Sequence, residues 1–366
     1  MKKIENIWIG AFFFMILGIP FLWILTGRYF DAENYEKRAE ISLPEVSFSG
    51  IENLPAAYEA YYNDHLPFRN QLIRFDSGLK YTVFQSSANQ NVIKGKEGWL
   101  FYNSYADDNP IESYKGMNLF TQEELVQIAD NLLHTEQELA KQGTEFVLFI
   151  APNKERIYAE KLPDYYGAPA TYYRTKQLVD YLRAETDLRI VYPYEELMWA
   201  KENGGRQLYY RLDTHWNFIG GYVGSRALVQ ELGAKLPALT ELTVTETEPT
   251  ICDLADQLNL RKFLNTDSDY VLSGYDQFGL IADRHEMTGA YEYHCTDGGD
   301  ERTLFMVRDS FADAMADFVA AAFQKSYMVH YSSYQDAMVV QQKPDIFVYE
   351  TVERRAGELL QFRVEL

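Results

Sequence analysis

The sequence predicts an α/β fold in which a mainly parallel sheet is flanked by helices. Short apolar runs of β type alternate along the chain with longer segments of helical periodicity. Strands that alternate with helices pair in parallel, and the helices cover both faces of their sheet. The expected strands occupy residues 145–150, 188–192, 304–307, 326–331 and 346–350.

Length and composition limit the classes of protein to consider. The 366 residues suit one large domain or two small ones, and the 47% apolar content is enough for a substantial core. The formal net charge of −20 argues against nucleic acid as a partner, because such binding requires basic patches.

The N-terminal region predicts a membrane anchor. Residues 7–25 are almost purely apolar and long enough to span a bilayer, with Trp8 and Trp23 near the two ends, where interfacial aromatic residues lie. We therefore expect an uncleaved signal anchor within residues 1–30 and a charged stalk at residues 31–50. A cleaved signal peptide is the alternative.

The clearest helix is expected at residues 121–142. Thr121 and Glu124 form a capping box at its start, and Gly143 ends it. Further helices are expected at residues 52–72, with Pro67 as a break, and at residues 172–184, 218–232 and 311–323.

Residues 234–302 interrupt the α/β pattern. This stretch is rich in Thr, Asp and Gly, and we expect it to be a β-rich insertion in a domain formed by residues 51–366. It carries Cys252 and Cys295, which have no metal-binding spacing and could form a disulfide or remain two buried thiols. The sequence predicts neither a metal site nor a cofactor.

Ser310 stands where an apolar strand meets a helix rich in small residues. A serine at such a corner suits a nucleophile, because its hydroxyl is exposed and the helix N-terminus favours developing negative charge. The alternative is a capping role, since Ser310 and Asp313 resemble a capping box.

Asp213 and His215 strengthen the catalytic interpretation. An aspartate and a histidine two residues apart can share a hydrogen bond, which leaves the other imidazole nitrogen for a serine. Asn153 and Lys154 follow a predicted strand, as Ser310 does, and ligands bind at the carboxyl ends of parallel strands. The sequence therefore predicts one site at this edge of the sheet.

With these residues identified, the chain resembles the AlgJ/AlgX/DHHW group of SGNH hydrolase-like proteins. These proteins are extracytoplasmic, and the alginate members O-acetylate a polysaccharide. The resemblance implies an SGNH hydrolase-like fold and a triad of Asp213, His215 and Ser310. The matching stretches are DHLPFR (64–69), GKEGWLFY (95–102), APNKERIY (151–158), DTHWN (213–217), CDLADQLNL (252–260) and RDSF (308–311).

Other residues receive expected roles in acyl transfer. The Ser310 backbone N–H and the Asn153 side chain are the expected oxyanion donors, and Arg308 stands where many SGNH-type sequences have glycine. Trp216, Lys154 and Arg156 are expected to contact glycan. The alternatives are core packing for Trp216 and a solvated surface for the two cations.

The function expected from the residues and the resemblance is a membrane-anchored, extracytoplasmic O-acetyltransferase acting on a cell-surface or exported polysaccharide. The resemblance implies a partner, a multipass acyltransferase of the MBOAT class. Two alternatives are an acetylesterase that uses the same triad and a non-catalytic glycan-binding subunit of an export complex.

Overall fold

The computed structural model describes residues 7–14, 18, 41–46, 51–264, 267–280, 282–287, 289–295 and 299–366. The chain divides into two units, one made of residues 1–89 and 255–264 and the other of residues 90–254 and 265–366. Residues 51–89, which we expected in the α/β domain, thus belong to the first unit.

Most of the predicted anchor and stalk lies outside the described residues. Within the part that is described, we find no helix long and apolar enough to cross a membrane. The signal anchor, and the alternative of a cleaved signal peptide, remain predictions.

The first unit contains helices α2 (Leu54–Asp64) and α3 (Arg69–Thr82). They replace the single helix predicted at residues 52–72, and the break falls around Pro67 as expected. Phe68, which precedes α3, has a φ of 60°, a left-handed conformation that no continuing helix allows.

The second unit is built on a seven-stranded sheet in the order β4-β3-β11-β9-β10-β8-β7. The five strands from β4 to β10 are parallel, whereas β8 and β7 are antiparallel additions at one edge, so the sheet is mixed. The strands are β3 (Glu145–Ala151), β4 (Arg189–Val191), β7 (Ala282–Met287), β8 (Ala290–Cys295), β9 (Asp300–Arg308), β10 (Phe323–His330) and β11 (Ile346–Val352).

Two smaller sheets and a set of helices complete this unit. The small sheets pair β1 (Val92–Lys94) with β2 (Leu100–Tyr102) and β5 (Thr243–Thr247) with β6 (Asp269–Ser273). The α-helices are α4 (Pro110–Tyr114), α5 (Gln122–Ala140), α6 (Lys154–Ile157), α7 (Arg174–Glu185), α8 (Tyr194–Gly204), α9 (Phe218–Glu231), α11 (Ala316–Ala321) and α12 (Ala337–Gln342), while α10 (Asp253–Gln257) begins in this unit and ends in the first. The 3₁₀ turns are η3 (Lys96–Gly98), η4 (Ala159–Lys161), η5 (Asp164–Tyr166), η6 (Leu239–Glu241), η7 (Asp276–Phe278), η8 (Ser310–Ala314), η9 (Tyr331–Ser333) and η10 (Glu353–Leu360).

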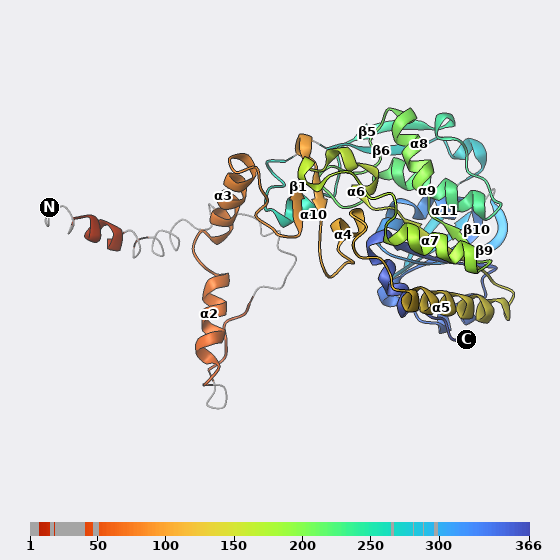
Figure 1. The fold of residues 1–366 in the computed structure, drawn as a ribbon, viewed down its shortest axis with the longest axis horizontal. Coiled ribbons are helices and arrows are strands. Elements are labelled where there is room, and N and C mark those ends of the chain that lie inside the picture. Colours follow the sequence, from red (N-terminus) through yellow and green to blue (C-terminus); the bar gives the residue numbers. More distant parts are fainter. Residues whose placement is uncertain are drawn as a thin grey trace. The chain divides into compact units, whose positions relative to one another are not determined.

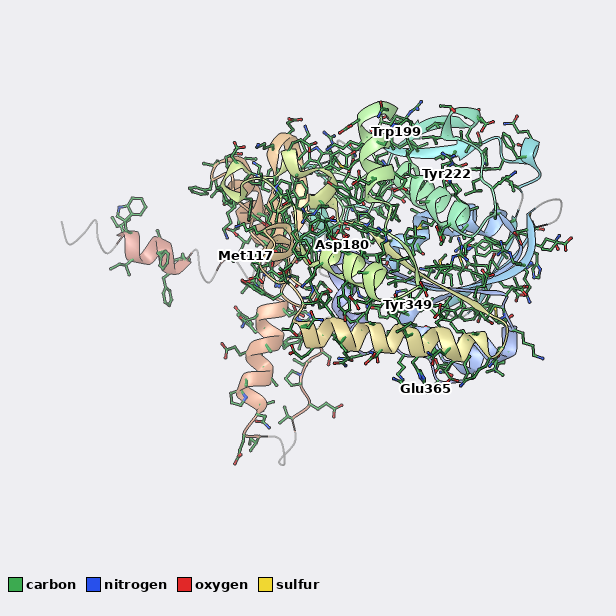
Figure 2. The ribbon with its side chains drawn as sticks, turned by 45° about the vertical axis from the view of Figure 1, so that its right-hand side comes forward. Met117, Asp180, Trp199, Tyr222, Tyr349 and Glu365 are labelled. Atoms are coloured by element: carbon green, nitrogen blue, oxygen red, sulfur yellow. The ribbon has the colours of Figure 1, made fainter. Side chains whose placement is uncertain are left out.

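Helices cover both faces of the sheet, as the sequence predicts (Figure 1). Alternate strand residues enter two hydrophobic clusters: Val147 packs with residues of α8, α9 and α11, and its neighbour Leu148 packs with residues of α5 and α7. Figure 2 accordingly shows Tyr222 of α9 and Tyr349 of β11 on opposite sides of the sheet.

The predicted capping box and end of helix α5 are confirmed. Thr121 caps it, both bonds of the predicted capping box with Glu124 are present, and Gly143 follows with a φ of 79°. Helix α8 was not predicted.

The predicted insertion at residues 234–302 is only partly separate from the main sheet. Strands β5 and β6 form a sheet of their own, but β7 and β8 extend the main sheet, and β9 begins at Asp300. The single helix predicted at residues 311–323 is also wrong. The chain forms η8 and the short helix α11, and Phe323 already starts β10.

Close packing against α9 holds the η8 turn. A side chain at Gly221 would overlap the backbone carbonyl of Ala314, so only glycine allows this approach. The contact places η8, which starts at Ser310, against the helix that follows His215 in the chain.

Candidate active site

The candidate site lies at the carboxyl ends of the neighbouring strands β3, β11 and β9. Asp309, directly after β9, fixes the corner, because its carboxylate accepts the backbone N–H groups of Phe311 (2.7 Å) and Val352 (2.8 Å). Its own N–H donates to the buried Glu350 (2.8 Å). Asp309 is therefore the N-cap, the capping role considered for Ser310 is wrong, and Ser310 is exposed on the turn.

Asp213, His215 and Ser310 form one continuous line of hydrogen bonds. His215 Nδ1 lies 2.6 Å from Asp213 Oδ1, and His215 Nε2 lies 2.8 Å from Ser310 Oγ. Because a carboxylate only accepts hydrogen bonds, Nδ1 is the donor, and in the neutral ring Nε2 accepts the Ser310 hydroxyl. Asp213 is buried, and the His215 side chain is 20% exposed, so solvent reaches the serine end of the line.

Several groups hold the turn that carries Asp213 and His215. The backbone N–H of Asp253 donates to Asp213 Oδ2 (2.7 Å), and the Asp253 carboxylate accepts the N–H and the hydroxyl of Thr214 (both 2.8 Å). Lys154 donates to the Asp213 carbonyl (2.9 Å). The orientation of the Asp213 carboxylate is thus fixed from both sides.

The electrostatics suit an ionised aspartate beside a basic histidine. Burial raises the pKa of Asp213, but the hydrogen bond and charge of His215 and the N–H of Asp253 outweigh burial and hold that pKa well below its ordinary value. Burial lowers the pKa of His215, yet the bond to Asp213 and its charge leave it above the ordinary 6.5. Burial and the nearby Asp213 charge raise the pKa of Asp253 to about 6.

The three residues expected to contact glycan are all buried in structural roles, so that expectation is wrong. Lys154 donates to three backbone carbonyls, which explains why its charge is tolerated inside. Arg156 donates to the Ala170 carbonyl (3.0 Å), and its guanidinium stacks on the Tyr173 ring. Trp216 is fully buried, the predicted alternative, and its indole N–H donates to the Phe311 carbonyl (2.7 Å).

Asn153 and Arg308 lie at the expected edge of the sheet. The Asn153 backbone N–H donates to Glu353 (2.9 Å), but its buried side-chain oxygen and nitrogen have no hydrogen-bond partner within the described part of the chain. An amide in this state can donate to a developing oxyanion. Arg308 is buried, and its guanidinium pairs with Asp313 (2.8 Å).

Arg354 is a site residue that the sequence analysis missed. Its guanidinium carbon lies 5.0 Å from the centre of the Phe311 ring and 5.3 Å from that of Tyr102, and its charge slightly offsets the rise in the pKa of His215. Among the described residues it has no ion pair. Its one sequence signal is its place two residues after the last strand, at an edge where ligands bind.

Asp253 was also missed, although it lies in the matched stretch at residues 252–260. The ligand atoms of Asp213, His215 and Asp253 lie within 4.8 Å of one another and could hold a metal ion. Of these atoms, His215 Nδ1 already bonds to Asp213 Oδ1, and the Asp253 carboxylate already accepts from Thr214, an arrangement that serves a triad equally well. Cys252 and Cys295 are not joined in a disulfide.

Comparison with known proteins shows what this domain is similar to. Residues 92–273 match the family model described as the SGNH hydrolase-like domain, acetyltransferase AlgX. The match includes Asp213, His215 and Asp253 and ends before β9. Residues 92–273 are therefore similar to an SGNH hydrolase-like domain.

Individual relatives agree with this class. A Pseudomonas fluorescens protein named a probable alginate O-acetylase, AlgJ, is 28% identical over 268 residues, which cover 73% of this chain and 61% of that protein. Two solved structures share the fold. PatB1 of Bacillus cereus has a TM-score of 0.55 at 14% identity, over 75% of this chain and 100% of that one. A DHHW family protein of Eubacterium siraeum has a TM-score of 0.50 at 13% identity, over 75% and 99%. The predicted resemblance to the AlgJ/AlgX/DHHW group is confirmed.

The position of Asp253 gives a first prediction. We expect Asp253→Ala to lower turnover of an activated acetyl ester about a hundredfold, because Thr214 loses its acceptor and the His215 ring shifts. Asp253→Asn keeps one acceptor oxygen and should retain more activity. Steady-state kinetics on variants whose circular dichroism matches wild type will test this. Equal rates for wild type and Asp253→Ala would contradict it.

Proposed function

We propose that this chain is an O-acetyltransferase that moves an acetyl group from a donor ester to a hydroxyl of a polysaccharide. The observation that supports it is the line of hydrogen bonds from buried Asp213 through His215 to exposed Ser310. The name of the AlgJ relatives, probable alginate O-acetylase, supports both the acetyl group and the class of acceptor.

In the first half-reaction, Ser310 Oγ attacks the acetyl carbonyl carbon while its proton passes to His215 Nε2. Asp213 holds the ring and stabilises the imidazolium. The tetrahedral intermediate then collapses, the bond to the donor alcohol breaks, and His215 gives its proton to that leaving group. The product is an acetyl ester on Ser310.

In the second half-reaction, a sugar hydroxyl attacks this acetyl ester, and its proton passes to His215. Collapse returns the proton to Ser310 Oγ and releases the acetylated sugar. The Asn153 amide is the proposed oxyanion donor, and one such donor can be worth about 3 kcal/mol of barrier. Arg354, beside the Phe311 ring, is the cation best placed to contact the acceptor.

We also propose that residues 7–25 anchor the chain in the cell membrane with its site outside the cytoplasm. A membrane-bound MBOAT-type partner would then supply the acyl group. We expect the full chain to stay with membranes after a carbonate wash. Its recovery as soluble protein with a new N-terminus near residue 28 would favour a cleaved signal peptide.

The raised pKa of His215 predicts the pH dependence. Only the neutral ring accepts the Ser310 proton, so kcat/KM for an activated acetyl ester should rise with pH through a midpoint above 6.5. In Asp213→Asn the midpoint should fall, because the group that raises the pKa is gone, and the plateau should drop by up to about 10⁴-fold. An unchanged midpoint in the pH–rate profile of Asp213→Asn would count against Asp213 as the partner.

The direct test of transfer uses the full chain, an acetyl donor ester and a panel of oligosaccharides, with mass spectrometry as the readout. We expect acetylated oligosaccharide with wild type and none with Ser310→Ala. Ser332→Ala is a matched control, because Ser332 also bonds a histidine at the end of a neighbouring strand (2.7 Å to His330). Free acetate alone across the panel, with deacetylation of acetylated glycans, would instead establish the acetylesterase.

A further inference from the structure

A groove of about 650 Å³ lies within the first unit, between one face of α3 and residues 260–264. The α3 side chains that line the groove recur at helical spacing, so they share one face of the helix. The volume of the groove is typical of a site for a small molecule. The residues that matter most for its character are Arg74, Phe75, Gly78, Leu79, Leu260 and Phe263.

Two nitrogen atoms of the Arg74 guanidinium give this apolar groove unsatisfied hydrogen-bond donors. Its Nε and Nη2 atoms are buried and have no hydrogen-bond partner among the described residues. A guanidinium does not lose its proton in proteins, so burying it without an acceptor costs free energy. An anionic group in the groove would accept hydrogen bonds from these donors, and the described part of the chain supplies no such group.

The apolar walls point to an acyl chain beside that anion. Phe75 and Phe263 are 69% and 66% exposed, and the whole of α3 buries only Ser77. Exposed apolar surface of this kind marks a site of interaction. Helix α3 carries three basic residues and one acidic residue, in a chain whose net charge is −20.

We propose that this groove binds a membrane phospholipid with an anionic headgroup. The headgroup phosphate would pair with the Arg74 guanidinium, whose planar donors match phosphate oxygens. An acyl chain would lie against Phe75, Leu79 and Phe263 and remove their surface from water. If residues 7–25, which precede α3 in the chain, anchor it as proposed above, a bilayer is the nearest source of this ligand. The inference does not rest on the proposed acetyl transfer.

The test is hydrogen–deuterium exchange of the full chain in detergent micelles with dioleoyl phosphatidylglycerol or dioleoyl phosphatidylcholine added. We expect the anionic lipid to slow exchange several-fold in residues 69–82 and 260–264, and the zwitterionic lipid to do so much less. Arg74→Gln should abolish the difference. Lys80→Gln, the matched control, should keep it, because the Lys80 ammonium already pairs with Asp76 (2.7 Å) on the same helix.

Equal protection by the two lipids, or protection that persists in Arg74→Gln, would overturn the proposal. The same protection from inorganic phosphate alone would assign the groove to a free anion. A dimer in native mass spectrometry that protects these residues without lipid would assign it to a second copy of the chain. Circular dichroism that matches wild type shows that each variant is folded. Ester turnover by Arg74→Gln, which lies outside the triad, separates this test from that of the proposed function.

Discussion

The buried carboxylate of Asp213 is the constraint on which the rest of the site depends. An ionised carboxylate inside a protein is stable only when hydrogen bonds replace the water that it loses. Asp213 accepts three: from His215 Nδ1, from the His215 backbone N–H (3.0 Å) and from the Asp253 backbone N–H. These bonds fix the tautomer of His215 and aim Nε2 at Ser310, so one charge sets the geometry and the basicity of the site.

The sheet supplies the other half of the arrangement. Asp309 ties the end of β9 to the end of β11 through the Val352 N–H, and Glu350 and Glu353 accept backbone N–H groups at the same edge. Because these strands run parallel in adjacent positions, loops far apart in sequence converge there. Close packing at Gly221 then presses η8 against α9, so Ser310 is held on a rigid turn.

Features that depend on local sequence patterns were predicted well. Apolar runs and caps located β3, β11 and α5, and the D-x-H spacing with the serine corner located Asp213, His215 and Ser310. Burial was not predictable in the same way. Lys154, Arg156 and Trp216 looked like ligand contacts, but partners from distant segments bury them. Strands β7 and β8 were assigned to an insertion because an antiparallel edge leaves no α/β rhythm in the sequence.

The residues that were missed show the same limit. Asp253 acts on Thr214 and Asp213 across about forty positions of sequence, and Arg354 reaches the site only because β11 ends beside β9. The residues of each contact are far apart in the sequence, and no regular spacing in a single sequence indicates that they meet. Each became visible through its hydrogen bonds or its ring contacts in three dimensions.

The central claim is that Ser310 carries the acetyl group during turnover. The most direct measurement is to mix the full chain with an excess of acetyl donor ester, quench in acid and locate the acetyl group by peptide mass spectrometry. The account predicts one acetyl group on the peptide that contains Ser310, and none there in His215→Ala. Acetyl found on another residue, or steady turnover with Ser310 unmodified and no burst of leaving group, would contradict it.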